Sequence, residues 1–114
     1  MNFPKRGEIW LVSLEPVVGH EIGKTRPAFV ISNNRNNQFA DTITVLPLTS
    51  KTEKIYPFET LLFKEESQLP KDSKVKANQI RTLDKKRLIK LLNRISKESL
   101  KKIEEALLIH LGII

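Results

Sequence analysis

The segment from Gly19 to Pro27 carries several reactive polar side chains between two apolar runs. It contains a histidine, a glutamate, a lysine, a threonine and an arginine. Loops mounted on a rigid sheet often carry binding and catalytic groups. Pro27 restricts the residue before it to extended conformations, so we expect the Arg26 guanidinium to be held in place. Because a guanidinium presents planar donors that match phosphate oxygens, this segment predicts a phosphate site at Arg26.

The other charged residues of this segment leave alternatives open. Glu21 is expected to orient Arg26 or Lys24 by pairing with it, as carboxylates beside arginines usually do. Because an arginine side chain is a poor base, His20 and Glu21 are rival candidates for proton transfer.

Two further polar segments follow apolar runs. The first ends in Thr49, Ser50 and Lys51, where the last two can bind backbone phosphates. A threonine after a strand is otherwise most often a turn former. The second runs from Asn78 to Thr82, and its two amide side chains have the groups needed to read base edges. Its Arg81 is expected either to meet a phosphate or to pair with Asp84.

The chain is short and basic. Its 114 residues predict a single domain, 1–114, with one modest core. The formal net charge is +7, and residues 71–114 account for all of it with 12 Lys/Arg against 5 Asp/Glu. This balance favours an anionic partner, first a nucleic acid and second an anionic membrane.

Several classes of protein are disfavoured by what the sequence lacks. There is no cysteine, so disulfides and thiolate metal sites are excluded. The only histidines are His20 and His110, and the acidic residues form no ligand cluster, so no metal or other cofactor is expected. No apolar leader or membrane-length run is present, and a cytoplasmic location is expected.

Strand patterns dominate the first eighty residues. We expect a turn over 32–37 and another over 68–73, and we expect Pro47 to end strand pairing or to mark an edge. The expected strands cover residues 9–14, 28–31, 43–46, 58–63 and 75–80.

The tail changes to a helical period. Leu100, Ile103, Leu107 and Leu111 recur at steps of three and four, Ser96 is a plausible N-cap, and Gly112 is a plausible stop. Residues 84–95 are expected to form a short helical turn and then a strand. The pattern as a whole predicts a mainly β fold, a small antiparallel sheet or barrel closed by a C-terminal helix.

Three segments together resemble the MazF/PemK family of toxin endoribonucleases, the RNA-cutting halves of bacterial toxin–antitoxin pairs. They are Arg6–Trp10 with the Gly19–Pro27 loop, Val45–Ser50, and Asn78–Thr82, and they stand in the order typical of the family. The resemblance runs from about Lys5 to Ile113. It implies a small SH3-like barrel of the MazF/CcdB-like toxin fold, a homodimer, and an acidic cognate antitoxin as partner.

The resemblance also implies metal-independent cleavage of single-stranded RNA, including mRNA, at a short sequence. It assigns the chemistry to Arg26 and Thr49. His20 departs from the small polar residues usual in relatives, and it can alter substrate preference or supply a proton-transfer group. The residues expected to contact RNA are His20, Glu21, Lys24, Thr25, Ser50, Lys51, Asn78, Gln79 and Arg81.

Elementary chemistry agrees with this reading. RNA carries its own nucleophile, the 2′-OH, beside the scissile phosphate, so attack needs positioning and charge stabilisation but no metal. Two alternatives use a related fold: a toxin that binds DNA gyrase without catalysis, and a barrel that binds RNA without cutting it. The chain ends Leu111-Gly112-Ile113-Ile114 and lacks the terminal Trp-Gly-Ile of the gyrase binders.

Overall fold

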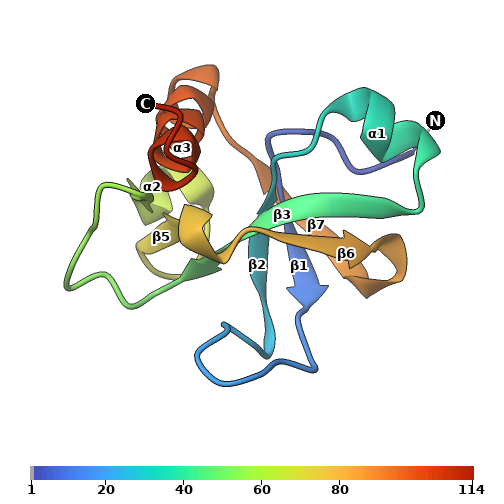
Figure 1. The fold of residues 1–114 in the computed structure, drawn as a ribbon, viewed down its shortest axis with the longest axis horizontal. Coiled ribbons are helices and arrows are strands. Elements are labelled where there is room, and N and C mark those ends of the chain that lie inside the picture. The colour runs from blue at the N-terminus through green and yellow to red at the C-terminus, as the bar shows by residue number, and fades with distance from the viewer. Residues whose placement is uncertain (1) are drawn as a thin grey trace.

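The computed structural model describes residues 2–114, which form one curled antiparallel sheet with short helices around it (Figure 1). The elements in chain order are β1 (Glu8–Ser13), β2 (Thr25–Val30), α1 (Asn34–Phe39), β3 (Thr42–Thr49), β4 (Glu59–Leu62), α2 (Lys64–Ser67), β5 (Ser73–Lys76), η1 (Ala77–Gln79), β6 (Arg81–Asp84), η2 (Lys85–Arg87), β7 (Leu88–Arg94) and α3 (Lys97–His110). The mainly β fold with a C-terminal helix is confirmed.

The strand β3 organises the sheet. The strand order is β4-β5-β3-β2-β1-β7, with β6 also paired to β3. One edge of β3 therefore pairs with β2, whereas its other edge pairs first with β6 and then with β5. Within residues 2–114 the outermost strands, β4 and β7, are not paired to each other. The sheet is thus curled but open, and the expectation of a closed barrel is corrected to that extent.

Pro47 lies inside β3 and not at its end. The ladder with β2 does end at Pro47, as expected, but β3 goes on to pair with β5 beyond it. Pro47 stands opposite Ala28 of β2. On its other side, β3 pairs with β6 up to Val45 and with β5 from Leu48. A proline lacks the N–H that a ladder requires. It is tolerated here because it falls at the change of partner between β6 and β5.

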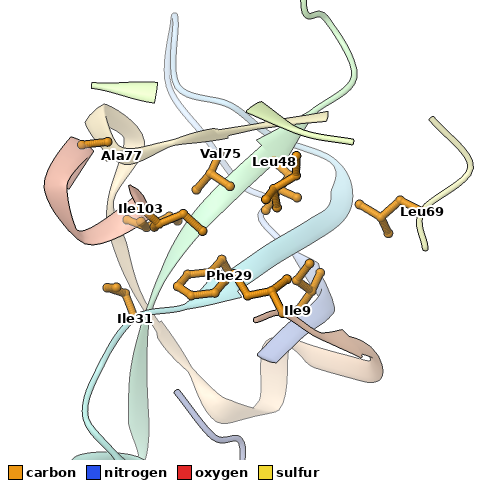
Figure 2. Close-up of a cluster of buried hydrophobic side chains, with 12 residues drawn as sticks. Ile9, Phe29, Ile31, Leu48, Leu69, Val75, Ala77 and Ile103 are labelled. Atoms are coloured by element: carbon orange, nitrogen blue, oxygen red, sulfur yellow. The ribbon is translucent and has the colours of Figure 1, made fainter. Parts of the chain in front are cut away.

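Two apolar clusters lie on opposite faces of the central strands. One contains Phe29 and lies beneath α3, and Figure 2 shows this ring among Ile9, Ile31 and Ile103. The other contains Val12, Ala28, Val30, Ile43 and Val45. Alternate residues of a strand face opposite sides. The continuous apolar run at 28–31 is therefore explained, because both faces of β2 are buried.

Three local features differ from the prediction. Residues 34–39 form a helix in place of a turn, because Asn33 caps it by accepting from the Asn36 N–H. The expected strand at 75–80 ends at Lys76 and continues as the single turn η1. The short helix α2 at 64–67 was not foreseen.

The C-terminal third of the chain follows the prediction closely. Asp84 caps the turn η2, and β7 follows it, as expected for residues 84–95. Ser96 caps α3 by accepting from the Ser99 N–H, and Gly112 follows the helix with a φ of +73°. The apolar residues predicted to line one face of this helix are only partly buried, because Ile103 is fully buried whereas Leu111 is 52% exposed.

Glu8 fixes the N-terminal turn to the sheet. Its side chain is only 4% exposed, and its two oxygens accept from the Lys5 N–H at 2.7 Å, the Trp10 indole at 3.0 Å and Arg94 at 2.9 Å. Burial alone would raise the pKa of Glu8, but these hydrogen bonds and the Arg94 charge outweigh it and hold the pKa below its ordinary value of 4.5.

We expect Glu8→Gln to destabilise the protein at neutral pH and not in acid. A carboxylate with a lowered folded-state pKa stabilises the fold above its unfolded pKa, and this contribution is lost as the pH falls through the folded value. Urea unfolding should give a loss of about 1–3 kcal/mol at pH 7, as for a charged buried hydrogen-bond acceptor. The difference from wild type should shrink toward pH 3.

The matched control is Glu105→Gln, which removes an exposed carboxylate from α3. It should change the free energy of unfolding by less than about 0.5 kcal/mol at either pH. A Glu8→Gln deficit of the same size at pH 7 and pH 3 would contradict the assignment.

Candidate functional site

Arg26 and Thr49 come from the neighbouring strands β2 and β3. The β2–β3 ladder pairs Ala28 with Pro47 and Phe29 with Leu46. The ladder ends at Ala28 and Pro47; Arg26 and Thr49 lie two residues beyond this last pair on their strands, and both line the same two pockets. Residues directly opposite in a sheet place their side chains on one face. Thr49 is paired with Lys74 of β5, so these two side chains lie on one face.

The Arg26 side chain is held by its own loop. Its Nε donates to the Gly23 carbonyl at 2.7 Å, and the side chain is half-buried. Within residues 2–114 its two terminal nitrogens have no hydrogen-bond or ion-pair partner. The guanidinium is therefore oriented from behind while its outer donors remain available, as a phosphate-binding arginine requires.

The Thr49 hydroxyl is also oriented with its proton free. Its Oγ1 accepts from the Lys51 N–H at 3.3 Å, so the backbone after β3 fixes the oxygen. A hydroxyl that accepts in this way can still donate its own proton. The turn-forming role and a role toward a bound oxygen are thus compatible in the same side chain.

Arg26 and Thr49 form the wall between two pockets. The first, of about 290 Å³, is also lined by Thr25, Ser50, Lys71 and Ser73 among others. The second, of about 490 Å³, is also lined by His20, Lys51, Glu53, Lys54, Tyr56, Lys74, Lys76 and Gln79. A bound polymer that passed from one pocket to the other would run past the Arg26 guanidinium and the Thr49 hydroxyl.

The larger pocket is strongly basic, and sequence reasoning missed part of that charge. Lys54, Lys74 and Lys76 line it together with the expected Lys51. A signal was present, because Lys74 and Lys76 are two residues apart and so project from the same face of β5. The lining residues Lys71 and Ser73 of the smaller pocket were also missed, since they lie in a segment that reads only as a turn.

The loop from Leu14 to Lys24 is closed by the chain around it. The Leu14 N–H donates to the Lys24 carbonyl at 2.9 Å, and a Glu15 carboxylate oxygen accepts from the Lys24 N–H at 3.0 Å. A Cβ at Gly23 would lie 2.6 Å from that Glu15 oxygen, so a side chain there would push the carboxylate away from the Lys24 N–H. Gly23 therefore lets its carbonyl approach Arg26 without disturbing the closure.

Several expected contact residues instead clamp this loop from the other side. Gln79 accepts from the Ile22 N–H at 3.2 Å and reaches the His20 carbonyl at 3.5 Å. Arg81 donates to the Leu14 carbonyl at 2.6 Å and does not pair with Asp84, which caps η2. Their polar groups are thus engaged in positioning the loop.

The remaining candidates are spread more widely. Glu21 accepts from the Val18 N–H at 2.7 Å, so the expectation that it pairs with Arg26 or Lys24 is wrong. Glu21, Asn78, Gln79 and Arg81 line a separate pocket of about 360 Å³. Lys24 lines neither of the pockets that Arg26 and Thr49 share.

The described part of the chain, residues 2–114, contains no group of three His, Asp or Glu residues that could hold a metal ion. None of its helices is long and apolar enough to cross a membrane. What the site offers is a fixed guanidinium, an oriented hydroxyl and a ring of lysines, a set suited to binding and polarising a phosphodiester.

Comparison with known proteins identifies relatives over nearly the whole chain. Residues 5–111 match the model of the family described as PemK-like, MazF-like toxin of type II toxin–antitoxin system. A protein named endoribonuclease MazF9, from Mycobacterium tuberculosis, is 42% identical over 96% of this chain and 97% of its own length.

Solved structures agree with this match. The crystal structure of MazF from Deinococcus radiodurans superposes with a TM-score of 0.84, at 29% identity, over 98% of this chain and 99% of that one. A mycobacterial endoribonuclease in complex with its cognate antitoxin gives a TM-score of 0.80, at 25% identity, over 97% of both chains.

We expect Gln79→Ala to loosen the loop above the site. Losing one hydrogen bond of about 1 kcal/mol should speed local amide exchange at Ile22 about fivefold. Hydrogen exchange followed by NMR measures this directly. The neighbouring Asn78→Ala is the matched control, because the Asn78 Oδ1 accepts no hydrogen bond within residues 2–114. An equal rate of amide exchange at Ile22 in the two variants would contradict this role of Gln79.

Proposed function

Because the chain belongs to the PemK-like, MazF-like toxins of type II toxin–antitoxin systems, we propose that it is an endoribonuclease toxin that cleaves single-stranded RNA. The family model covers residues 5–111, so the relationship includes every candidate site residue. The relative that is 42% identical to this chain is named an endoribonuclease, and this name supports the proposed activity.

One observation supports the cleavage chemistry most directly. Arg26 and Thr49 lie between two pockets, each oriented by a backbone group and each with donors free. A scissile phosphate between them would receive hydrogen bonds from both side chains. The lysines of the larger pocket would attract the neighbouring phosphates.

The proposed reaction is an internal transfer at phosphorus. The substrate 2′-oxygen gives its proton to water or a side-chain base and forms a bond to the phosphorus. The bond to the 5′-oxygen breaks, and that oxygen takes a proton from water or a side-chain acid, so that one proton is released and one taken up. The products are a 2′,3′-cyclic phosphate and a 5′-OH. Arg26 stabilises the charge that develops on the phosphoryl oxygens, and Thr49 donates to one of them.

The two candidates for proton transfer, His20 and Glu21, lie in different surroundings. Glu21 is turned away to the Val18 N–H, and we assign it no part in the reaction. His20 lines the larger pocket with Arg26 and Thr49. We propose that it lines the groove and tunes substrate preference, while a direct proton-transfer role is the alternative that its removal tests.

The partners follow from the same surface. A basic pocket suits an acidic antitoxin, and the similar mycobacterial and Deinococcus toxins have structures with their antitoxins.

We further propose a single domain, a cytoplasmic location and a homodimer. Two groups of exposed apolar residues support self-association: Leu111, Ile113 and Ile114 at and beyond the end of α3, and Ile89 and Leu91 on β7.

The cleavage proposal predicts activity on single-stranded RNA in excess EDTA. Sequencing of the fragment ends should give 2′,3′-cyclic phosphate and 5′-OH termini. Replacing the 2′-OH of the cleaved nucleotide with hydrogen should abolish cutting, because the nucleophile is then missing. Cleavage that persists on the deoxy substrate would overturn the mechanism, and RNA binding without any cutting would overturn the activity.

Single variants test the roles in the same assay. Arg26→Ala should lower the rate by at least about 100-fold, as expected when a main charge stabiliser is removed. Thr49→Ala should lose a similar or somewhat smaller amount. His20→Ala should mainly change the sequence preference, whereas a loss equal to that of Arg26→Ala with a flattened pH–rate profile would make His20 a proton-transfer group.

The dimer proposal predicts a particle of about twice the 13.1 kDa chain mass by light scattering at micromolar concentration. Association would cover apolar side chains that a single copy leaves in water, and it would join two basic pockets in one assembly. A mass of one chain at that concentration and above would refute this proposal.

A further inference from the structure

A buried ion pair lies behind the larger pocket. The Glu59 side chain is 0% exposed and the Lys74 side chain 8%, and the Lys74 Nζ lies 2.9 Å from the Glu59 Oε1. Lys76, opposite Glu59 in the β4–β5 ladder, approaches the Glu59 Oε2 to 3.3 Å. One carboxylate thus holds two lysines whose other surfaces line the pocket.

Glu59 and Lys74 also hold the segment 50–58 in place. This stretch between β3 and β4 contains no helix or strand, and it extends away from the sheet at the left of Figure 1. The Lys74 Nζ donates to the Lys54 carbonyl at 2.8 Å. The Tyr56 N–H donates to the Glu59 Oε1 at 3.0 Å, and the Glu59 N–H returns a bond to the Tyr56 carbonyl at 2.9 Å.

Aromatic contacts strengthen this attachment. The Lys74 Nζ lies 5.7 Å from the centre of the Tyr56 ring, on which Phe58 stacks with a centroid separation of 5.4 Å. A cation near an aromatic face is attracted by the ring, more strongly when water is excluded. Tyr56 is therefore fixed through both its backbone and its ring.

The segment 50–58 faces the residues proposed for catalysis. Its Lys51, Lys54 and Tyr56 line the larger pocket together with Arg26 and Thr49. Lys74 is also the cross-strand partner of Thr49. The ion pair is thus joined to Thr49 through β5 and to the pocket wall through the segment.

We propose that Glu59 and Lys74 are positioning residues for RNA binding, which fix the segment 50–58 so that its lysines face a substrate held at Arg26 and Thr49. This inference rests on the proposed endoribonuclease function. Neither residue is assigned a step in the reaction. Their effect is on where the neighbouring phosphates are held relative to the scissile one.

Charge and position make opposite predictions for Glu59. If only the charge of the pocket mattered, removing a carboxylate would tighten the binding of an anionic substrate. If the carboxylate positions the segment, removing it weakens binding although the pocket becomes more positive. Glu53 supplies the matched control, because it is an exposed carboxylate that lines the same pocket without contacting the ion pair.

The test compares steady-state cleavage of a single-stranded RNA by the wild type, Glu59→Gln and Glu53→Gln. We expect Glu59→Gln to raise KM about tenfold while kcat stays within about threefold, since the reacting groups are retained. Glu53→Gln should lower KM or leave it unchanged. A KM that falls in both variants would overturn the proposal, because charge alone would then account for it.

A second measurement separates positioning from a general loss of stability and needs no RNA. Hydrogen exchange at residues 51–56 should be faster in Glu59→Gln, with exchange in α3 unchanged. The double variant Glu59→Gln/Lys74→Met should recover thermal stability relative to Lys74→Met, because the buried Glu59 carboxylate loses its nearest lysine in the single variant and is uncharged in the double one, while exchange at 51–56 remains fast. Wild-type exchange at 51–56 in all variants would overturn the positioning role.

The two proposals fail in different ways. A wild type that does not cut RNA would refute the endoribonuclease function, and the exchange experiment would still decide whether the ion pair fixes the segment. A wild type that cuts RNA, with Glu59→Gln unchanged in KM and in exchange, would refute the positioning role alone.

Discussion

The pairing of β3 along both of its edges is the constraint on which the site depends. β2 on one edge brings Arg26 to the two pockets that Thr49 also lines, and β5 on the other edge pairs Lys74 with Thr49. Cross-strand neighbours share one face of a sheet, so Thr49 and Lys74 are aligned before any loop is placed. A slip of one residue in either ladder would turn a side chain of the site to the opposite face.

Buried carboxylates fix the irregular parts of the chain to this sheet. Glu8 binds the N-terminal turn and Glu59 the segment 50–58, and each accepts from backbone N–H groups and from basic side chains. Burial alone would raise the pKa of Glu59. The hydrogen bond from the Tyr56 N–H and the two lysines lower the pKa by more than burial raises it, so the net shift is downward. Breaking such a pair leaves an uncompensated charge, which makes both connections costly to lose.

The sequence predicted the elements whose signals are local. The apolar run at 28–31, the cap at Ser96 and the stop at Gly112 all rest on residues near in the chain. The role of Pro47 was missed because it depends on a change of strand partner, which is a tertiary fact. The pairing of Glu21 was missed for a different reason: its partner, the Val18 N–H, is local, but the composition of the loop does not reveal the turn that brings the two together.

The basic excess of the chain overstates how much charge a bound polyanion would meet. Arg81 and Arg87 donate to carbonyls of the first loop, and Arg94 pairs with Glu8. These guanidinium groups use some of their donors to hold the first loop and Glu8 in place, so part of the basic excess serves the fold. The charge that faces the pocket comes instead from β5 and from the segment 50–58, whose lysines are brought together only by the fold. We therefore expect affinity for an anion here to depend on which lysines the ion pair of Glu59 directs to the pocket, more than on net charge.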